Sequence, residues 1–229
     1  MGISPDPVEL TPKQRKKQNV YKFFSPSCGR EVELESFVEF IVWLSFEFDS
    51  AIQFICERPG PLVARVDGKE ETYTPDLFVR NIDGEEFLVE SKKQEDLVET
   101  EDSVRLPKRW HVLSSVAAQY QLPLQLRTDA DFLDHRVGVG NWREALPHVA
   151  SEVQRPRYEL RKFVLDQFNT EAHLTIGELA AGTTDWEPSE VHSVALWCVH
   201  QGDLLLDWNA SPLGRQTLLA KAESRNASP

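Results

Sequence analysis

Asp76, Glu90 and Lys92 are the side chains of this sequence whose types and spacing could act together in a reaction. Two neighbouring carboxylates repel each other unless a proton or a cation lies between them. Oxygen ligands with open coordination positions suit Mg²⁺ or Mn²⁺, which also take ligands from a substrate phosphate. An ammonium beside the ion can orient or help deprotonate an attacking water and offset developing negative charge. The three residues therefore indicate metal-assisted hydrolysis of a phosphodiester.

A β-hairpin is the element that must bring these side chains together. Asp83-Gly84 separates two apolar runs, and Asp-Gly supplies the positive φ angles of a tight turn. Side chains alternate along a strand, so Glu90 and Lys92 share one face. Pro75 places Asp76 where a strand begins or bulges. The alternative is a solvated hairpin whose charges simply pair across strands, because such short patterns also arise by chance.

A helix is expected to add a third carboxylate. Residues 24–48 begin with turn and cap residues and continue with apolar side chains at helical spacing. These apolar residues are Leu34, Phe37, Val38, Ile41, Val42 and Leu44. Glu31, Glu35 and Glu39 follow one another at intervals of four residues. A solvated acidic stripe accounts for each glutamate, but like charges at this spacing are mildly destabilising. One glutamate turned toward a metal is therefore the alternative.

The order of the other elements predicts a mixed α/β domain. Strands are expected within residues 51–59 and 62–68, ahead of the hairpin. A helix is expected within residues 107–120, followed by a short strand at 123–127. Residues 93–103 are acidic without a clear apolar face, which indicates a loop or a frayed helix near the site. Such an order gives a sheet with helices packed on it.

Three segments of the chain resemble the PD-(D/E)xK nuclease superfamily, and more narrowly TnsA, the transposon-end endonuclease of heteromeric cut-and-paste transposases. They are Leu34-Glu-Ser-Phe-Val-Glu-Phe-Ile-Val-Trp43, Tyr73-Thr-Pro-Asp-Leu-Phe-Val79 and Leu88-Val-Glu-Ser-Lys92. The similarity covers roughly residues 23 to 150. It implies a restriction-endonuclease-like mixed sheet flanked by helices, with the strand near 123–127 beside the Glu90 strand.

The resemblance also implies a role for each site residue. Glu35 corresponds to the helix glutamate, Asp76 to the metal aspartate, Glu90 to the second metal residue and Lys92 to the catalytic lysine. The implied cofactor is Mg²⁺, for which Mn²⁺ can substitute. Asp76 and Glu90 would hold the ions, Glu35 would add a ligand directly or through water, and Lys92 would position the attacking water.

The C-terminal part is expected to form a separate domain. Glycines and prolines within residues 137–156 mark a boundary. Three helices and a short strand beyond it resemble a winged helix, whose third helix often enters a DNA groove. That helix would be residues 188–200, which contain no Lys or Arg, so we expect it to dock on protein. The expected domains are a flexible basic arm (1–22), a nuclease domain (23–150) and a winged-helix-like domain (151–229).

The net charge of −12 is unusual for a DNA-binding chain. Residues 1–30 hold six Lys or Arg against two acids, whereas residues 31–154 hold 12 against 25. An acidic body cannot drive nonspecific DNA binding by counterion release, so a partner is expected to deliver the chain to DNA. The basic segment 11–18 is either an arm that contacts phosphates or a solubilising tail.

Composition limits the cellular setting. Cys28, Cys56 and Cys198 are too scattered for a disulfide framework or a zinc site, which favours a reducing cytosol. No apolar run approaches the roughly 18 residues of a membrane span, and no secretory signal is recognisable, so no membrane partner is expected.

The resemblance implies an endonuclease that cuts the 5′ (non-transferred) strand at transposon ends in the bacterial cytoplasm. Its substrate would be double-stranded DNA, and its partners a DDE-type transposase, which cuts and joins the 3′ ends, and an AAA+ ATPase regulator. Two alternatives remain open. One is another PD-(D/E)xK nuclease of restriction or repair, and the other is a noncatalytic recruitment or adaptor subunit on an inherited fold.

Overall fold

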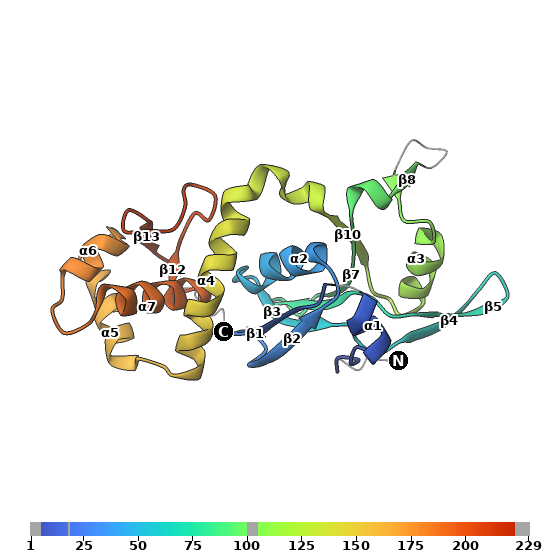
Figure 1. Cartoon of the computed structure of the whole chain (residues 1–229), viewed down its shortest axis with the longest axis horizontal. Helices are drawn as coiled ribbons and strands as arrows, with labels where there is room; N and C mark the ends of the chain where they lie inside the picture. The colour runs from blue at the N-terminus through green and yellow to red at the C-terminus, as the bar shows by residue number, and fades with distance from the viewer. Residues whose placement is uncertain (1–5, 18, 100–104, 223–229) are drawn as a thin grey trace. The chain divides into compact units, whose positions relative to one another are not determined.

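The computed structural model describes residues 6–17, 19–99 and 105–222 (Figure 1). It is a mixed α/β protein, 40% helix and 27% strand, as the sequence predicts. The chain folds into two compact units. Unit 1 holds residues 1–47 and 51–134, and unit 2 holds residues 48–50 and 135–229. None of the helices in the described residues is both long enough and apolar enough to cross a membrane.

A four-stranded sheet forms the centre of unit 1. Its strands are β3 (Ile52–Glu57), β6 (Leu77–Asn81), β7 (Glu86–Lys92) and β10 (Leu124–Thr128). Their order is β10-β7-β6-β3, with β10 parallel to β7 and the other pairs antiparallel. The expected hairpin is therefore present as β6–β7, with Gly84 at φ +81° in its loop. The strand expected near 123–127 does lie beside the Glu90 strand.

One helix covers each face of this sheet, because the strands alternate two sets of apolar side chains. Helix α2 (Phe37–Glu47) packs on the first face and α3 (Trp110–Gln119) on the second. The core on the first face includes Val38, Val42, Trp43, Ile55, Leu77, Val79 and Val89. The core on the second face includes Cys56, Phe78, Leu88, Val116 and Ala117. The helix expected within residues 107–120 is confirmed.

The segment before α2 is a β-hairpin, and the expectation that Glu31 begins a helical stripe was wrong. Strands β1 (Tyr21–Ser25) and β2 (Arg30–Leu34) pair antiparallel, with Gly29 at φ +64° in the turn. Val32 and Leu34 are fully buried, while Glu31 and Glu33, which alternate with them, are not, which is the alternation of a strand. Glu35 lies in the bend that precedes α2, so the three glutamates do not share a helix face.

A second hairpin, β4 (Leu62–Val66) with β5 (Lys69–Tyr73), follows β3. The end of α3 holds it in place, because the hydroxyl of Tyr120 donates to the carbonyl oxygen of Val63 and accepts from its N–H, each at 3.0 Å. The second core on the sheet continues into this hairpin through Leu62 and Tyr73. The hairpin therefore delivers Tyr73, its last residue, to the end of the sheet where Asp76 precedes β6.

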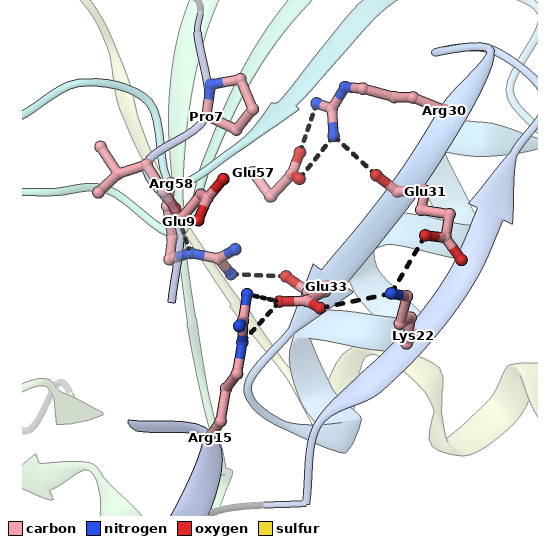
Figure 2. Close-up of a pocket in the computed structure, with 10 residues that line it drawn as sticks. Pro7, Glu9, Arg15, Lys22, Arg30, Glu31, Glu33, Glu57 and Arg58 are labelled. Atoms are coloured by element: carbon pink, nitrogen blue, oxygen red, sulfur yellow. Dashed lines mark hydrogen bonds and ion pairs between the residues drawn. The ribbon is translucent and has the colours of Figure 1, made fainter. Parts of the chain in front are cut away.

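The described part of the expected arm is docked on unit 1 rather than free (Figure 2). The N–H of Val8 donates to the carbonyl oxygen of Arg58 at 2.9 Å, and Nε of Arg58 donates back to the carbonyl oxygen of Val8 at 3.1 Å. Leu10 is buried, and Arg15 of helix α1 (Pro12–Lys17) pairs with Glu33 at 2.9 Å. Backbone pairing and charge together fix this segment.

Residues 93–103 contain a short 3-10 helix, η1 (Gln94–Asp96), and strand β8 (Val98–Glu99), which pairs with β9 (Arg105–Leu106). The rest of that expected loop, residues 100–104, lies outside the described residues. A second 3-10 helix, η2 (Asp129–His135), ends unit 1. Asp129 accepts the N–H of Gln94 at 2.7 Å, so η2 and η1 are linked beside the end of β7.

Unit 2 contains four helices among its described residues: α4 (Arg136–Gln154), α5 (Tyr158–Gln167), α6 (Ile176–Ala181) and α7 (Pro188–His200). The division between units falls at residue 135 rather than 151, because residues 137–150 are part of α4. Gly138, Gly140 and Pro147, which indicated a boundary, lie inside this helix, and Pro156 follows it. Gly138 has a packing role there, since a Cβ at this position would lie 2.5 Å from Oδ1 of Asn209.

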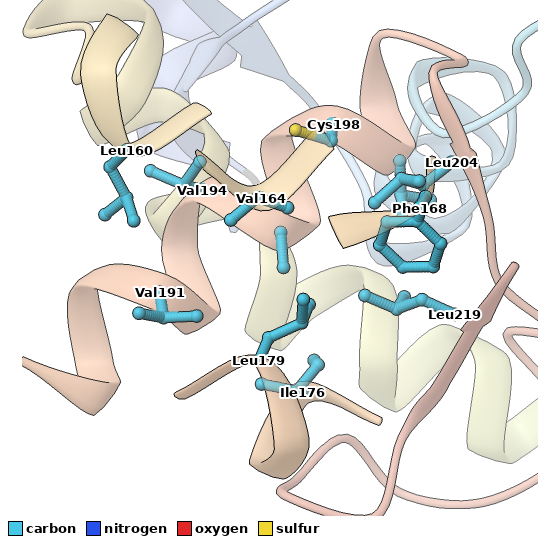
Figure 3. Close-up of a cluster of buried hydrophobic side chains, with 12 residues drawn as sticks. Leu160, Val164, Phe168, Ile176, Leu179, Val191, Val194, Cys198, Leu204 and Leu219 are labelled. Atoms are coloured by element: carbon cyan, nitrogen blue, oxygen red, sulfur yellow. The ribbon is translucent and has the colours of Figure 1, made fainter. Parts of the chain in front are cut away.

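Three short strands complete unit 2: β11 (His173–Thr175), β12 (Leu204–Leu205) and β13 (Leu218–Lys221), in the order β11-β13-β12. Chain order is thus helix, strand, two helices and two strands after α4. Figure 3 shows the apolar core that joins them. Its members include Leu160, Val164, Phe168, Ile176, Leu179, Val191, Val194, Cys198, Leu204 and Leu219.

Gly177 of α6 is expected to be intolerant of a side chain. A Cβ there would lie 2.8 Å from the carbonyl oxygen of Arg215, which also accepts the Gly177 N–H at 2.7 Å. We expect Gly177→Ala to lower the free energy of unfolding by about 1–3 kcal/mol, the usual cost of overpacking. Gly140→Ala is the control, because nothing lies within 4 Å of its Cβ and alanine favours a helix. Equal stability of the two variants in urea melts would contradict the close approach.

Candidate functional site

Asp76 and Glu90 meet at the ends of two adjacent strands. Leu77 of β6 is opposite Val89 of β7, so the residue before Leu77 and the residue after Val89 lie side by side. The backbone N–H of Ser91 donates to Oδ2 of Asp76 at 2.6 Å, which ties the aspartate to β7. The hairpin register thus places both carboxylates where the sequence predicts them.

Lys92 lies between the two carboxylates. Its Nζ is 2.6 Å from Oε1 of Glu90 and 3.8 Å from Oδ2 of Asp76. The ammonium therefore already compensates the charge of this pair. The structure brings together the three residues on which the sequence hypothesis depends, in an arrangement that attracts a cation.

Burial and like charge shape the electrostatics of this group. Burial, followed by the charge of Glu90, raises the pKa of Asp76 well above its usual value, while Lys92 opposes the shift. Burial alone would lower the pKa of Lys92, but the charges of Asp76 and Glu90 outweigh it and raise that pKa. The lysine is therefore a protonated cation at neutral pH. The aspartate gains from any further positive charge near it.

Two glutamates from the start of α2 lie on the same pocket, and they differ in their partners. Glu39 is buried, its Oε1 accepts from Oγ of Ser36 at 3.0 Å and its Oε2 accepts from the N–H of Glu35 at 3.0 Å. This is a capping arrangement of the Ser-x-x-Glu type, a sequence signal that was missed. The charge of Glu39 raises the pKa of Asp76 and of Lys92, so it acts on the site.

Glu35, the residue assigned to the metal by resemblance, is held by the N-terminal segment. Its Oε1 accepts from Nε2 of Gln14 at 2.9 Å. Glu35 and Glu39 both line the pocket that contains Asp76 and Lys92, whereas Glu31 lines a different pocket. Of the three candidate glutamates, Glu35 and Glu39 therefore lie at this pocket, and Glu31 lies at another.

The pocket at this site has a volume of about 500 Å³. Its walls come from the bend before α2, from the ends of β6 and β7, and from the docked N-terminal segment. Val8, Thr11 and Gln14 line it opposite Lys92 and Asp76. A wall built by the N-terminal segment was not expected from the sequence, which indicated a free arm.

Tyr73 is a site residue whose role the sequence did not reveal. It is 5% exposed, and its hydroxyl donates to Oε2 of Glu90 at 2.8 Å. The signal available was its place three residues before Asp76, inside the segment that carries the resemblance. Spacing alone could not show that this ring points toward Glu90.

A neighbouring pocket of about 250 Å³ holds charges that are paired within the protein (Figure 2). Arg30 binds both carboxylate oxygens of Glu57, each at 2.7 Å. Nη1 of Arg58 donates to the carbonyl oxygen of Glu33 at 2.6 Å, and Lys22 pairs with Glu31 at 3.1 Å. These contacts connect β1, β2, β3 and the N-terminal segment. The charged residues of this pocket therefore hold segments of the fold together, and Arg30, Arg58 and Lys22 each have a partner within the protein.

The donor set at the Asp76 pocket suits a hard divalent cation. Within the described residues, no group of three or more His, Cys, Asp or Glu side chains is arranged as a metal cage. Asp76 and Glu90 supply two carboxylates, and an ammonium already lies against them. Mg²⁺ commonly takes one or two carboxylates and completes its shell with water and phosphate oxygens. An oxygen-only pair of which Asp76 lines the pocket fits that habit and does not fit structural zinc.

Comparison with models of known protein families finds no match for this chain, and comparison with curated proteins finds no relative. The functional assignment therefore depends on the geometry of the site and on the resemblance of its motifs.

Proposed function

We propose that this chain is a Mg²⁺-dependent DNA endonuclease subunit of a TnsA-like heteromeric transposase, which cuts the 5′ strand at transposon ends. The observation that carries the proposal is the convergence of Asp76, Glu90 and Lys92 at the ends of paired strands, beside a pocket. A mixed sheet with β10 parallel to β7 and a helix on each face supports the same assignment.

Each site residue has a chemical task in this proposal. Asp76 and Glu90 would hold the ion, with Mn²⁺ able to replace Mg²⁺, and Glu35 or Glu39 adds negative charge from the start of α2. When bound, the ion activates water and stabilises charge on the phosphate. Lys92 orients the attacking water and offsets negative charge as the phosphodiester bond breaks.

The net charge of the chain supports an enzyme that works together with other subunits. The chain has a net charge of −12, so its affinity for double-stranded DNA must come largely from other subunits. The proposed partners are a DDE-type transposase that processes the 3′ ends and an AAA+ ATPase regulator. The proposed location is the bacterial cytoplasm.

Unit 2 is proposed to be a winged-helix-like docking domain. The order α5, β11, α6, α7, β12 and β13, with the three strands in one sheet, supports this assignment. Helix α7 contains no Lys or Arg and begins beside Glu187 and Glu190, whose carboxylates disfavour entry into a DNA groove. A protein surface of the transposase is the better partner for it.

The acidic charge also favours a second candidate, a noncatalytic adaptor that uses this fold to recruit other subunits. The deciding experiment is strand-specific cleavage of transposon-end DNA by the chain reconstituted with its neighbouring transposase. The nuclease proposal expects 5′-strand cuts that need both this chain and Mg²⁺, and that disappear in EDTA while bound complexes persist. Transposition without any cut by this chain would favour the adaptor. Cleavage of unrelated duplexes without the transposase would favour a restriction or repair nuclease.

A further inference from the structure

We propose that Tyr73 is a positioning residue that fixes Glu90 for metal binding, an inference that rests on the proposed nuclease function. The two oxygens of Glu90 have different partners. Oε2 accepts from the Tyr73 hydroxyl at 2.8 Å, and Oε1 is 2.6 Å from Nζ of Lys92. The phenol therefore fixes one oxygen and turns the other toward the place where the ammonium, and by inference a divalent cation, resides.

The Tyr73 hydroxyl has the chemistry that this task requires. The Tyr73 side chain is buried, and its hydroxyl lies 2.8 Å from Oε2 of Glu90. A phenol hydroxyl is uncharged at neutral pH, and beside a carboxylate it serves as the donor. A neutral donor of this kind orients a ligand without competing with the metal for charge.

Asp76 is positioned in the same way by a different group. Its Oδ2 accepts the backbone N–H of Ser91 at 2.6 Å. Each carboxylate of the pair thus has one oxygen held by an uncharged donor of the protein. Substitutions of Ser91 other than proline leave this backbone donor in place, whereas Tyr73→Phe removes the hydroxyl.

The β4–β5 hairpin supports Tyr73 mechanically. Tyr73 is opposite Leu62 in the hairpin, and both side chains are buried in the core beneath α3. Nε2 of Gln119 donates to the carbonyl oxygen of Arg65 at 3.0 Å, and Tyr120 holds the backbone of Val63. A ring fixed by its own hairpin and by α3 can define the orientation of Glu90.

Calorimetric titration of the full chain with Mn²⁺ tests the proposal without requiring activity. We expect Tyr73→Phe to weaken Mn²⁺ binding about 10- to 100-fold, the usual effect of losing a group that orients a metal ligand. The Mg²⁺ concentration for half-maximal cleavage in the reconstituted complex should rise by a similar factor. Cleavage at saturating Mg²⁺ should recover, which a general loss of structure would not allow.

Tyr158→Phe is the matched control, because Tyr158 is an exposed side chain of α5 in unit 2, whereas Tyr73 and Glu90 lie in unit 1. Its Mn²⁺ affinity should equal that of the wild type. In a Glu90→Gln background, Tyr73→Phe should have no further effect, because the hydroxyl acts through that carboxylate. Equal Mn²⁺ affinity of wild type and Tyr73→Phe would overturn the role of Tyr73 alone. Failure of the wild type to bind Mn²⁺ would overturn the metal site and the proposed function with it.

A second measurement needs no substitution at Tyr73 in the tested protein. The chain has four tyrosines, so fluorotyrosine labelling gives few resonances, which single Tyr→Phe variants assign. Addition of Mg²⁺ should shift the resonance of Tyr73 and leave that of Tyr120 in place. A Tyr73 resonance that does not shift although Mg²⁺ binds would contradict the proposal.

Discussion

Replacing Asp76 by asparagine is expected to abolish 5′-strand cleavage while leaving the protein folded. Asparagine keeps the shape of the side chain and an oxygen that can accept the N–H of Ser91, now 2.6 Å from Oδ2. It removes the negative charge that pairs with Lys92 and would hold the ion. Loss of one such electrostatic contact costs at least about 10²- to 10³-fold in rate. The measurement is single-turnover cleavage of labelled transposon-end DNA in the reconstituted complex.

Asp76→Asn is also expected to remove an unfavourable charge from the folded, metal-free protein. Burial and Glu90 raise the pKa of Asp76, so its ionised form is unfavourable in the folded state. Asp76→Asn should therefore be at least as stable as the wild type in EDTA while it loses cleavage. Asp96→Asn is the control, since Asp96 lines the same pocket from η1 and is exposed. Normal cleavage by Asp76→Asn would remove this aspartate from the chemistry and favour the adaptor function.

Lys92→Met is expected to make the stability of the protein depend on divalent cations. Methionine keeps an unbranched stem but removes the ammonium that lies 2.6 Å from Oε1 of Glu90. Two largely buried carboxylates then face each other without a cation. Because Lys92 is partly exposed and a carboxyl can take up a proton, we expect a loss of only about 1–3 kcal/mol in EDTA. For a chain of this size that is a fall in melting temperature of roughly 2–4 °C per kcal/mol.

Addition of Mg²⁺ or Mn²⁺ should restore the melting temperature of Lys92→Met by more than it raises that of the wild type, since the ion replaces the lost charge. Cleavage should stay low, because no ammonium remains to orient water. The neighbouring variant Lys93→Met is the control, since Lys93 lines the same pocket but is exposed and pairs with Glu95 at 3.4 Å rather than with Asp76 or Glu90. If the melting temperature of Lys92→Met is the same in EDTA and in divalent cations, the two carboxylates share no cation site.

The hairpin that carries the site could be predicted from the sequence, because two independent signals agreed there. Val79 and Phe78, like Val89 and Leu88, alternate between two buried faces, and Gly84 allows the turn. Since register is fixed whenever both faces are buried, the meeting of Asp76 with Glu90 followed from it. Local pattern and long-range packing therefore pointed to the same structure.

The start of α2 was placed too early because a short segment satisfies two periodicities. Val32 and Leu34 are two residues apart, as in a strand, and Leu34 also fits the helical spacing of Phe37, Val38 and Ile41. The Ser36-x-x-Glu39 cap marks the true beginning, and it also shows why Glu39 rather than Glu31 approaches the site. Recognition of that cap would have corrected the boundary and separated Glu31 from the two glutamates that line the pocket.

The docking of the N-terminal segment could not be predicted from local patterns. Its firmest contacts use backbone atoms, as between Val8 and Arg58, which are 50 residues apart in the sequence. Its side chains are mostly polar and basic, which resembles a solvated arm. Its partners, Arg58 after β3 and Glu33 of β2, are brought to this segment only by the tertiary fold.

The N-terminal segment also determines how this protein can be manipulated. Because Val8, Thr11 and Gln14 line the pocket, an affinity tag or linker joined shortly before Pro7 would emerge close to it. A shortened version that begins at Tyr21 would open that side and free the carboxylate of Glu35 from Gln14. Expression strategies that treat the first twenty residues as dispensable would therefore change the site that they are meant to expose.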